Sequence, residues 1–201
     1  MKLYSNISKK LIMSLAIFSL VLGLSKPQST FADTTLELID SELSSDAEKI
    51  MNDPILVEMM TYIKTDDTGI LYFDTEMAIK SGASEQVLVD GKIFNRFSND
   101  YENYENAPGS ETIVMARLKL PVWGNWCGPG HGGGATKDLL DAACKQHDLD
   151  YGKYGYFDCG SDFRLIARIS RDYDRMKFFE KSMARSVVAY FYAQLSFNQC
   201  Y

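Results

Sequence analysis

The side chains best suited to chemistry lie in the segment Cys144-Lys-Gln-His147-Asp148-Leu-Asp-Tyr151. Residues three and four positions apart share one face of an α-helix, so Cys144, His147, Asp148 and Tyr151 form a single stripe. An imidazole is the usual general base near neutral pH, and a carboxylate is a preferred ligand of hard cations. A lone histidine on a helix is usually structural, but a His-Asp pair on this stripe indicates a catalytic or metal-binding face.

A glycine-rich loop precedes this stripe, with six glycines between Gly124 and Gly134. Closely spaced glycines let a backbone turn sharply and direct several carbonyl oxygens at one point. Calcium takes six to eight oxygen ligands, and backbone carbonyls are common among them. A nucleotide-binding loop would end in Gly-Lys-Ser/Thr, which this loop lacks. The remaining alternative is a flexible linker.

Two aspartates beyond the stripe can orient the imidazole. If the chain forms an antiparallel helix hairpin, Asp162 lies opposite His147. A carboxylate bonded to one ring nitrogen fixes the tautomer and leaves the other nitrogen free to act as a base. The alternative is that Asp162 caps the second helix and that Asp158 orients the ring.

Three helices are expected to position these residues. Hydrophobic periodicity predicts them over 137–151, with Thr136 as N-cap, over 158–169 and over 175–195. The apolar stripes of these helices favour a packed core over a lipid-binding surface. Residues 113–201 therefore predict an all-α domain.

Residues 33–112 predict a small mixed α+β segment. Helical spacing runs from residue 36 to residue 63, with an interruption at Asp53-Pro54. The other expected features are strands at 69–73 and 86–89, a turn at Asp90-Gly91, and a polar linker over 98–110.

The charge is unevenly distributed along the 201 residues, whose net charge is −6. Residues 33–112 hold 18 acidic and 5 basic side chains, whereas residues 113–201 hold 9 acidic and 12 basic ones. This asymmetry predicts two parts, of which the acidic one is a propeptide or an accessory domain. So acidic a chain is a poor ligand for nucleic acid, which we do not expect as a partner.

Residues 1–32 have the layout of a secretory signal peptide, with cleavage near Ala32. Lysines 2, 9 and 10 precede an uncharged apolar stretch over 11–24, which is short for a membrane span. A retained membrane anchor is the alternative. We expect a secreted protein, whose four cysteines pair in two disulfides, and three pairings are open.

The loop Trp126-Cys127-Gly128-Pro129-Gly130, followed by Cys144-Lys-Gln-His147-Asp148, resembles the secreted phospholipase A2 family. The resemblance covers about residues 120–170. It implies an all-α phospholipase A2-like domain built on an antiparallel two-helix hairpin with two disulfides, here preceded by the mixed α+β acidic segment. It further implies a monomer that binds Ca²⁺ and hydrolyses the sn-2 ester of glycerophospholipids at a membrane or micelle surface.

The resemblance also implies a role for each matching residue. His147 is the base that activates water, Asp162 orients it, and Tyr151 supports that pair. The Gly128 amide stabilises the oxyanion. The implied calcium ligands are the carbonyls of Trp126, Gly128 and Gly130 and the carboxylate of Asp148, and the implied disulfides are Cys127–Cys144 and Cys159–Cys200.

The chain departs from the family pattern at three positions. His131 replaces the second glycine of the loop, and Ala143 and Asp150 stand where animal members carry cysteines. These departures favour the bacterial or viral branch, which has fewer disulfides. The alternatives are a non-catalytic phospholipase-like binding or toxin module, and a structural zinc site of the two histidines with Cys127 and Cys144.

Overall fold

A computed structural model describes residues 46–105, 122–130, 132–156, 158–197 and 200. The predicted signal peptide, His131 and part of the predicted linker lie outside these residues. Among the residues described, no helix is both long enough and apolar enough to cross a membrane.

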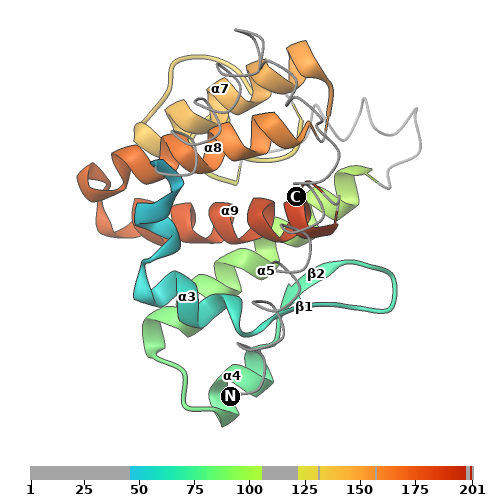
Figure 1. Ribbon diagram of the computed structural model, residues 1–201, viewed down its shortest axis with the longest axis vertical. Coiled ribbons are helices and arrows are strands. Elements are labelled where there is room, and N and C mark those ends of the chain that lie inside the picture. The colour runs from blue at the N-terminus through green and yellow to red at the C-terminus, as the bar shows by residue number, and fades with distance from the viewer. Residues whose placement is uncertain (1–45, 106–121, 131, 157, 198–199, 201) are drawn as a thin grey trace, which may run out of the picture. The chain divides into compact units, whose positions relative to one another are not determined.

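The described chain is mostly helical and contains one small sheet (Figure 1). Residues 46–51 are also helical. The named elements are α3 (Pro54–Met60), β1 (Ile63–Thr65), β2 (Leu71–Phe73), α4 (Thr75–Lys80), α5 (Glu85–Glu105), α7 (Leu139–Tyr154), α8 (Cys159–Asp172), the 3-10 turn η1 (Tyr173–Arg175) and α9 (Phe178–Phe197).

The sheet is a two-stranded antiparallel hairpin in which Ile63 pairs with Phe73. Its strand β2 lies within the predicted strand at 69–73. Leu71 and Phe73 point into the core. The side-chain amide of Asn95 in α5 bonds the backbone of Phe73 on both sides, at 2.6 Å to its nitrogen and 3.0 Å to its oxygen. These bonds attach the edge of the hairpin to α5.

The predicted strand at 86–89 and the turn at Asp90-Gly91 are wrong, because both lie inside the long helix α5. Val87 and Phe94 are fully buried at helical spacing. Gly91 packs directly against Phe73, where an added Cβ would lie 2.3 Å from the ring. The glycine therefore allows a close helix-to-sheet contact instead of a turn. The described part of the predicted linker, up to residue 105, also belongs to α5.

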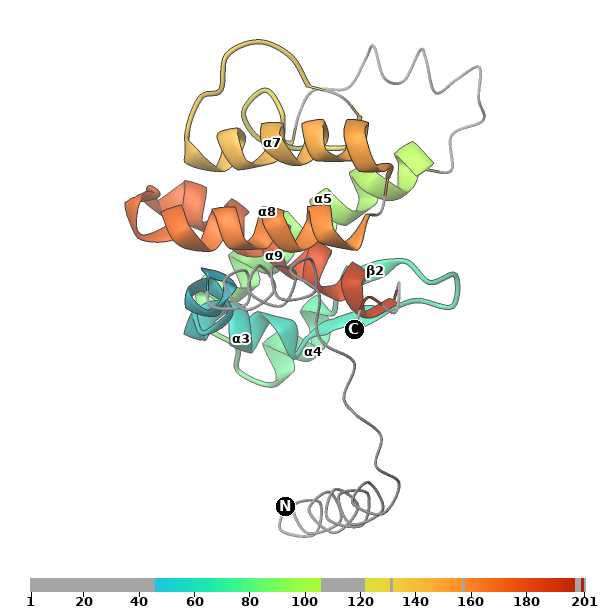
Figure 2. The same ribbon diagram turned by 45° about the horizontal axis from the view of Figure 1, so that its top comes forward.

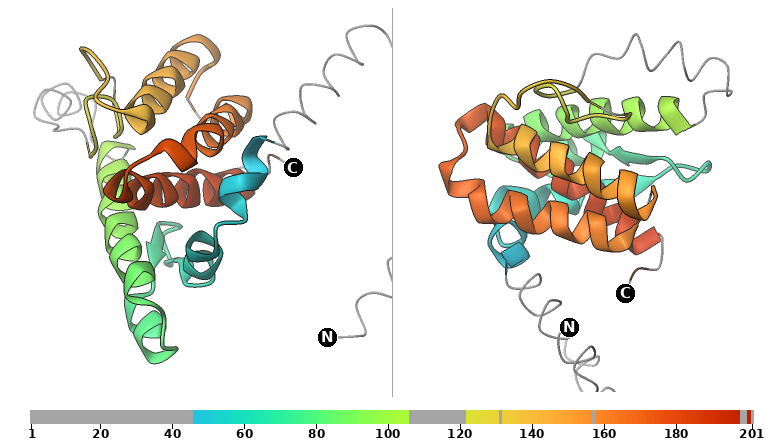
Figure 3. Two further views of the ribbon diagram at one scale, coloured as in Figure 1. Left: turned by 90° about the vertical axis from the view of Figure 1, so that its left-hand side faces the viewer. Right: turned by 90° about the horizontal axis from the view of Figure 1, so that it is seen from above.

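Helices α5 and α9 pack together across the predicted boundary between the two parts (Figure 3). The fully buried carboxylate of Asp90 lies 2.5 Å from Nε of Arg185, which is itself buried. The hydroxyl of Ser186 donates to the Asp90 carbonyl at 3.0 Å. Residues from both sides of the boundary form one hydrophobic core, so in this structure they are not two independent bodies.

Helices α7 and α8 lie side by side as an antiparallel hairpin (Figure 2). Helix α7 ends at Gly155, whose φ of 101° favours glycine. Asp158 caps α8 by accepting a hydrogen bond from the Ser161 amide. The N-cap of α7 is Asp138, which accepts from the Asp141 amide, so the prediction of Thr136 is wrong. Asp138 immediately precedes the helix, so its carboxyl group can accept from the free amides of the first turn, which Thr136 lies too far upstream to do.

Two disulfides reinforce this arrangement. Cys127 pairs with Cys144, which joins the glycine-rich loop to α7. Cys159 pairs with Cys200, which joins the start of α8 to the chain after α9. Both are the pairings that the phospholipase resemblance implied.

Candidate active site

The hairpin places the imidazole of His147 against the carboxylate of Asp162. Nε2 of His147 lies 2.8 Å from Oδ1 of Asp162, and both side chains are almost fully buried. A carboxylate only accepts hydrogen bonds, so this contact assigns a hydrogen to Nε2, and in the neutral imidazole Nδ1 then keeps its lone pair. No described residue bonds Nδ1. Of the two aspartates that the sequence leaves open, Asp162 contacts the ring, whereas Asp158 is occupied as a helix cap.

Tyr151 strengthens the same pair from one turn further along α7. Its hydroxyl donates to Oδ1 of Asp162 at 2.5 Å, and its ring lies 4.0 Å from the imidazole of His147. Burial, followed by the charge and hydrogen bond of Asp162, raises the pKa of Tyr151, which therefore remains a donor. The ring of Phe191 in α9 also contacts the imidazole, at 4.7 Å between centroids and nearly perpendicular to it. These contacts hold the imidazole in one orientation.

Asp141, which the sequence analysis did not single out, anchors the glycine-rich loop to α7. Its carboxylate is fully buried and accepts from three backbone amides: those of Asn125 at 2.9 Å, Trp126 at 2.8 Å and Lys137 at 2.9 Å. Gly124 sits directly beside this carboxylate, because an added Cβ would lie 2.2 Å from its carbon. The signal in the sequence was position 141, which precedes Cys144 by three residues and shares its helix face.

The rest of the loop uses glycines where other residues would be strained. Gly128 has a φ of 144° and Gly130 a φ of 88°. An added Cβ on Gly132 would lie 2.5 Å from the Asn125 carbonyl oxygen. Within the described ranges, neither Gly128 nor Gly130 takes part in a hydrogen bond. Their carbonyl oxygens are therefore available as ligands, as far as the described chain is concerned.

Asp148 faces this loop from α7. Its Oδ2 accepts from the Gly132 amide at a long 3.3 Å. Burial raises the pKa of Asp148 to about 7; the Gly132 amide lowers it, and the charge of Asp141 adds to the increase. A half-buried carboxylate that has one weak hydrogen bond and pairs with no cation among the described residues has unused capacity to accept.

This donor set fits a hard divalent cation. It combines the carboxylate of Asp148 with backbone carbonyls of the loop, and both are oxygen ligands of the kind that calcium takes. Among the described residues, no group of three or more His, Cys, Asp or Glu side chains is arranged to hold a metal. A cation at this place would therefore depend mainly on backbone oxygens, as the phospholipase resemblance implied for Trp126, Gly128 and Gly130.

The zinc alternative does not fit this structure. Cys127 and Cys144 are bonded to each other, so neither sulfur can act as a thiolate ligand. With Cys159 bonded to Cys200 as well, no cysteine of the chain is free to act as a nucleophile.

Asp150, where animal members of the resembled family carry a cysteine, links the two hairpin helices. Its Oδ2 lies 2.8 Å from Arg168 and 3.3 Å from Arg164, both in α8. Burial works to raise the pKa of Asp150, but the hydrogen bonds and charges of these arginines outweigh burial and lower it. An ion-pair cluster thus stands at this position.

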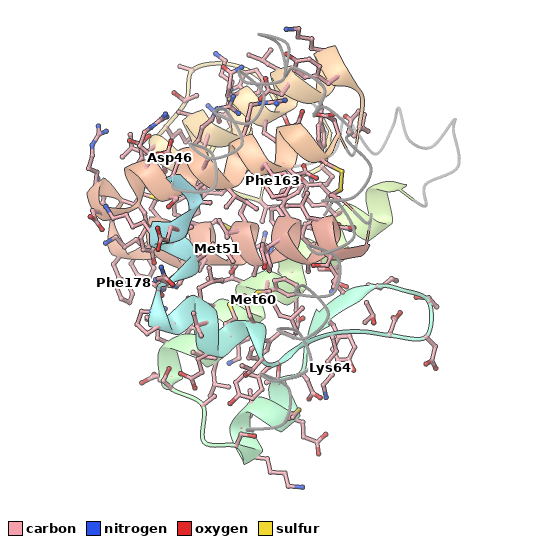
Figure 4. All side chains as sticks on the ribbon, viewed as in Figure 1. Asp46, Met51, Met60, Lys64, Phe163 and Phe178 are labelled. Atoms are coloured by element: carbon pink, nitrogen blue, oxygen red, sulfur yellow. A yellow bond between two sulfur atoms is a disulfide. The ribbon has the colours of Figure 1, made fainter. Side chains whose placement is uncertain are left out.

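A cavity of about 270 Å³ lies elsewhere, between β1, β2 and the C-terminal half of α9. Met60 and Lys64, labelled in Figure 4, are among its lining residues, and none of the proposed site residues is. The ammonium group of Lys64 is paired with Asp74 at 2.8 Å. This cavity plays no part in the site around His147.

No family model, no curated protein and no solved structure matches the chain.

Proposed function

We propose that the protein is a secreted, calcium-dependent hydrolase of the phospholipase A2 type, which cleaves the sn-2 ester of glycerophospholipids. The observation that carries the proposal is the 2.8 Å contact between His147 and Asp162, with Asp148 one residue away facing a loop of glycines. A buried, oriented imidazole beside a cation-binding loop is suited to activating water next to a polarised carbonyl group.

The chain's own residues would divide the chemistry as follows. Asp162 holds the hydrogen of Nε2, and Tyr151 holds Asp162. Nδ1 of His147 then removes a proton from a water molecule as that water attacks the ester. The Gly128 amide donates to the developing oxyanion, a kind of contact that lowers a barrier by about 3 kcal/mol. Calcium, when bound by Asp148 and the loop carbonyls, supplies Lewis-acid polarisation of the ester carbonyl.

The test is fatty-acid release from mixed micelles of phosphatidylcholine and detergent, measured with calcium and with excess chelator. We expect the parent protein to be active only with calcium. His147→Gln should lower the rate by about 10²-fold or more, because the general base is lost. Gln146→Ala, an exposed change at the neighbouring position, is the matched control and should retain the parent rate.

Full activity in excess chelator would show that calcium is not needed for catalysis. A His147→Gln variant as active as the parent would show that His147 is not the general base. A folded parent protein that releases no fatty acid under any calcium concentration would favour the non-catalytic binding module instead.

A further inference from the structure

Tyr101, near the C-terminal end of α5, belongs to an aromatic cluster with Phe97, Tyr190 and Phe191. Phe191 connects this cluster to His147. The ring centroid of Tyr101 lies 4.8 Å from that of Phe97 and 5.0 Å from that of Tyr190. It also meets Phe191 at 5.7 Å in a perpendicular arrangement, and Phe191 contacts the imidazole of His147. The acidic N-terminal part of the chain thus reaches the proposed site through Tyr101.

The hydroxyl group of Tyr101 interacts electrostatically with the carboxylates of the proposed site. Burial raises the pKa of Tyr101 well above its usual value, and the charges of Asp148 and Asp162 raise it further. The phenol therefore stays protonated and is available as a hydrogen-bond donor. The Tyr101 side chain is only partly buried, and no residue of the described chain hydrogen-bonds to its hydroxyl, so this donor is open to a ligand as far as the described residues are concerned.

We propose that the Tyr101 hydroxyl donates a hydrogen bond to an oxygen atom of the bound phospholipid, so that α5 forms part of the substrate site. This inference rests on the proposed function. It is carried by the ring contacts that connect Tyr101 to His147 and by the hydroxyl that no described residue accepts from. Carbonyl and phosphate oxygens of the lipid are both suitable acceptors. The acidic part is then a component of the catalytic unit and not a removable cover.

The test compares Tyr101→Phe with the parent protein. This variant keeps the ring and its packing and removes only the hydroxyl. The control is Tyr72→Phe, which makes the same change at an exposed tyrosine on β2. The probe is a short-chain phosphatidylcholine analogue with an amide in place of the sn-2 ester, used below its critical micelle concentration. Its affinity in calcium is measured by titration calorimetry.

We expect Tyr101→Phe to bind this analogue about fivefold more weakly, as for one lost hydrogen bond, with an unchanged melting temperature. Tyr72→Phe should bind like the parent. A second analogue without the phosphocholine group identifies the acceptor: a fivefold loss with both analogues indicates the carbonyl oxygen, and a loss with the first alone indicates the phosphate.

Equal affinities of parent and Tyr101→Phe for the first analogue would overturn the inference, as would a parent that binds neither analogue. Fatty-acid release, assayed in parallel on ester substrate, keeps the two proposals apart. If the parent protein binds the analogue through Tyr101 but does not hydrolyse the ester, the proposed hydrolase activity is refuted and the inference about Tyr101 is not.

Discussion

Replacing Asp90 with alanine measures how firmly the acidic N-terminal part is joined to the helices of the site. The carboxylate is fully buried and bonds Nε of Arg185 at 2.5 Å. It also accepts from the amide of Gln86 at 2.7 Å. Without it, the partners left to the buried guanidinium of Arg185 among the described residues are the hydroxyls of Tyr173 at 2.6 Å and Ser182 at 3.4 Å and the carboxylate of Asp53 at 4.0 Å.

The expected loss in the free energy of unfolding is about 3–5 kcal/mol, because the variant takes from a buried charge its nearest counter-ion and leaves only the more distant carboxylate of Asp53. That is a large share of the roughly 5–15 kcal/mol by which domains are stable. The control is Arg175→Ala, which breaks the exposed 2.8 Å pair between Arg175 and Asp172. It should cost about 0–1 kcal/mol.

The assay is equilibrium unfolding in urea with the disulfides intact, followed by circular dichroism. Equal slopes for parent and variants would show that the difference in midpoint reports stability. A double variant, Asp90→Leu with Arg185→Met, should lose less than Asp90→Ala, because it removes both charges from the core.

A loss below about 1 kcal/mol for Asp90→Ala, no larger than that of the surface control, would refute the reasoning. The packing of α5 on α9 would then contribute little. If the reasoning holds, a fragment of residues 113–201 should not fold by itself, because its α9 would expose the face that α5 covers.

Three further outcomes are expected. The pKa of Asp148 in the folded state, about 7, lies above its ordinary value of 3.8, so without calcium stability should fall as pH rises from about 4 to about 7 and level off above that. The whole loss is at most about 4 kcal/mol, and the part between pH 5 and pH 8 is at most about 3 kcal/mol, both reduced by solvent screening. Urea unfolding of Asp148→Asn at pH 5 and 8 should lack this difference. Gly124→Ala should destabilise the protein by about 2 kcal/mol or more, because the added Cβ meets Asp141 and the residue has a φ of 62°. The control Gly133→Ala, where the added Cβ meets nothing, should change the melting temperature little. Equal melting temperatures of the two variants would contradict this. Opening the loop-to-helix disulfide with Cys144→Ser should cost about 3 kcal/mol in thermal unfolding and weaken calcium binding measured by calorimetry; unaltered calcium affinity would show that the loop holds its shape without the bond.

Local features of the sequence were sufficient for much of the site. The helical period alone places His147, Asp148 and Tyr151 on one face, because neighbours at three and four positions align whatever surrounds the helix. The glycines of the loop mark positions where backbone must turn sharply, and Gly128 and Gly130 do adopt positive φ. The start of the second helix at Asp158 was also close to its observed position.

Other features depended on contacts between segments far apart in the chain. The run at 86–89 is mostly apolar and contains two β-branched valines, which favours a strand. It is nevertheless helical, because Gly91 and Val87 pack against the hairpin and the core. Short apolar runs carry no period long enough to decide between the two. The stretch over 98–110 looked like a linker because most of its residues are polar, although its tyrosine at position 101 lies in the aromatic cluster.

What the sequence by itself determined is therefore the chemistry of one helix face and the flexibility of the loop before it, since both follow from residue type and local spacing. Only the tertiary structure decided which aspartate meets His147, because Asp158 and Asp162 differ in partners and not in chemistry. It also decided that Asp141 anchors the loop and that α5 reaches the site. Those roles arise from segments brought together by the common core, and a pattern read along one segment holds no information about its partner.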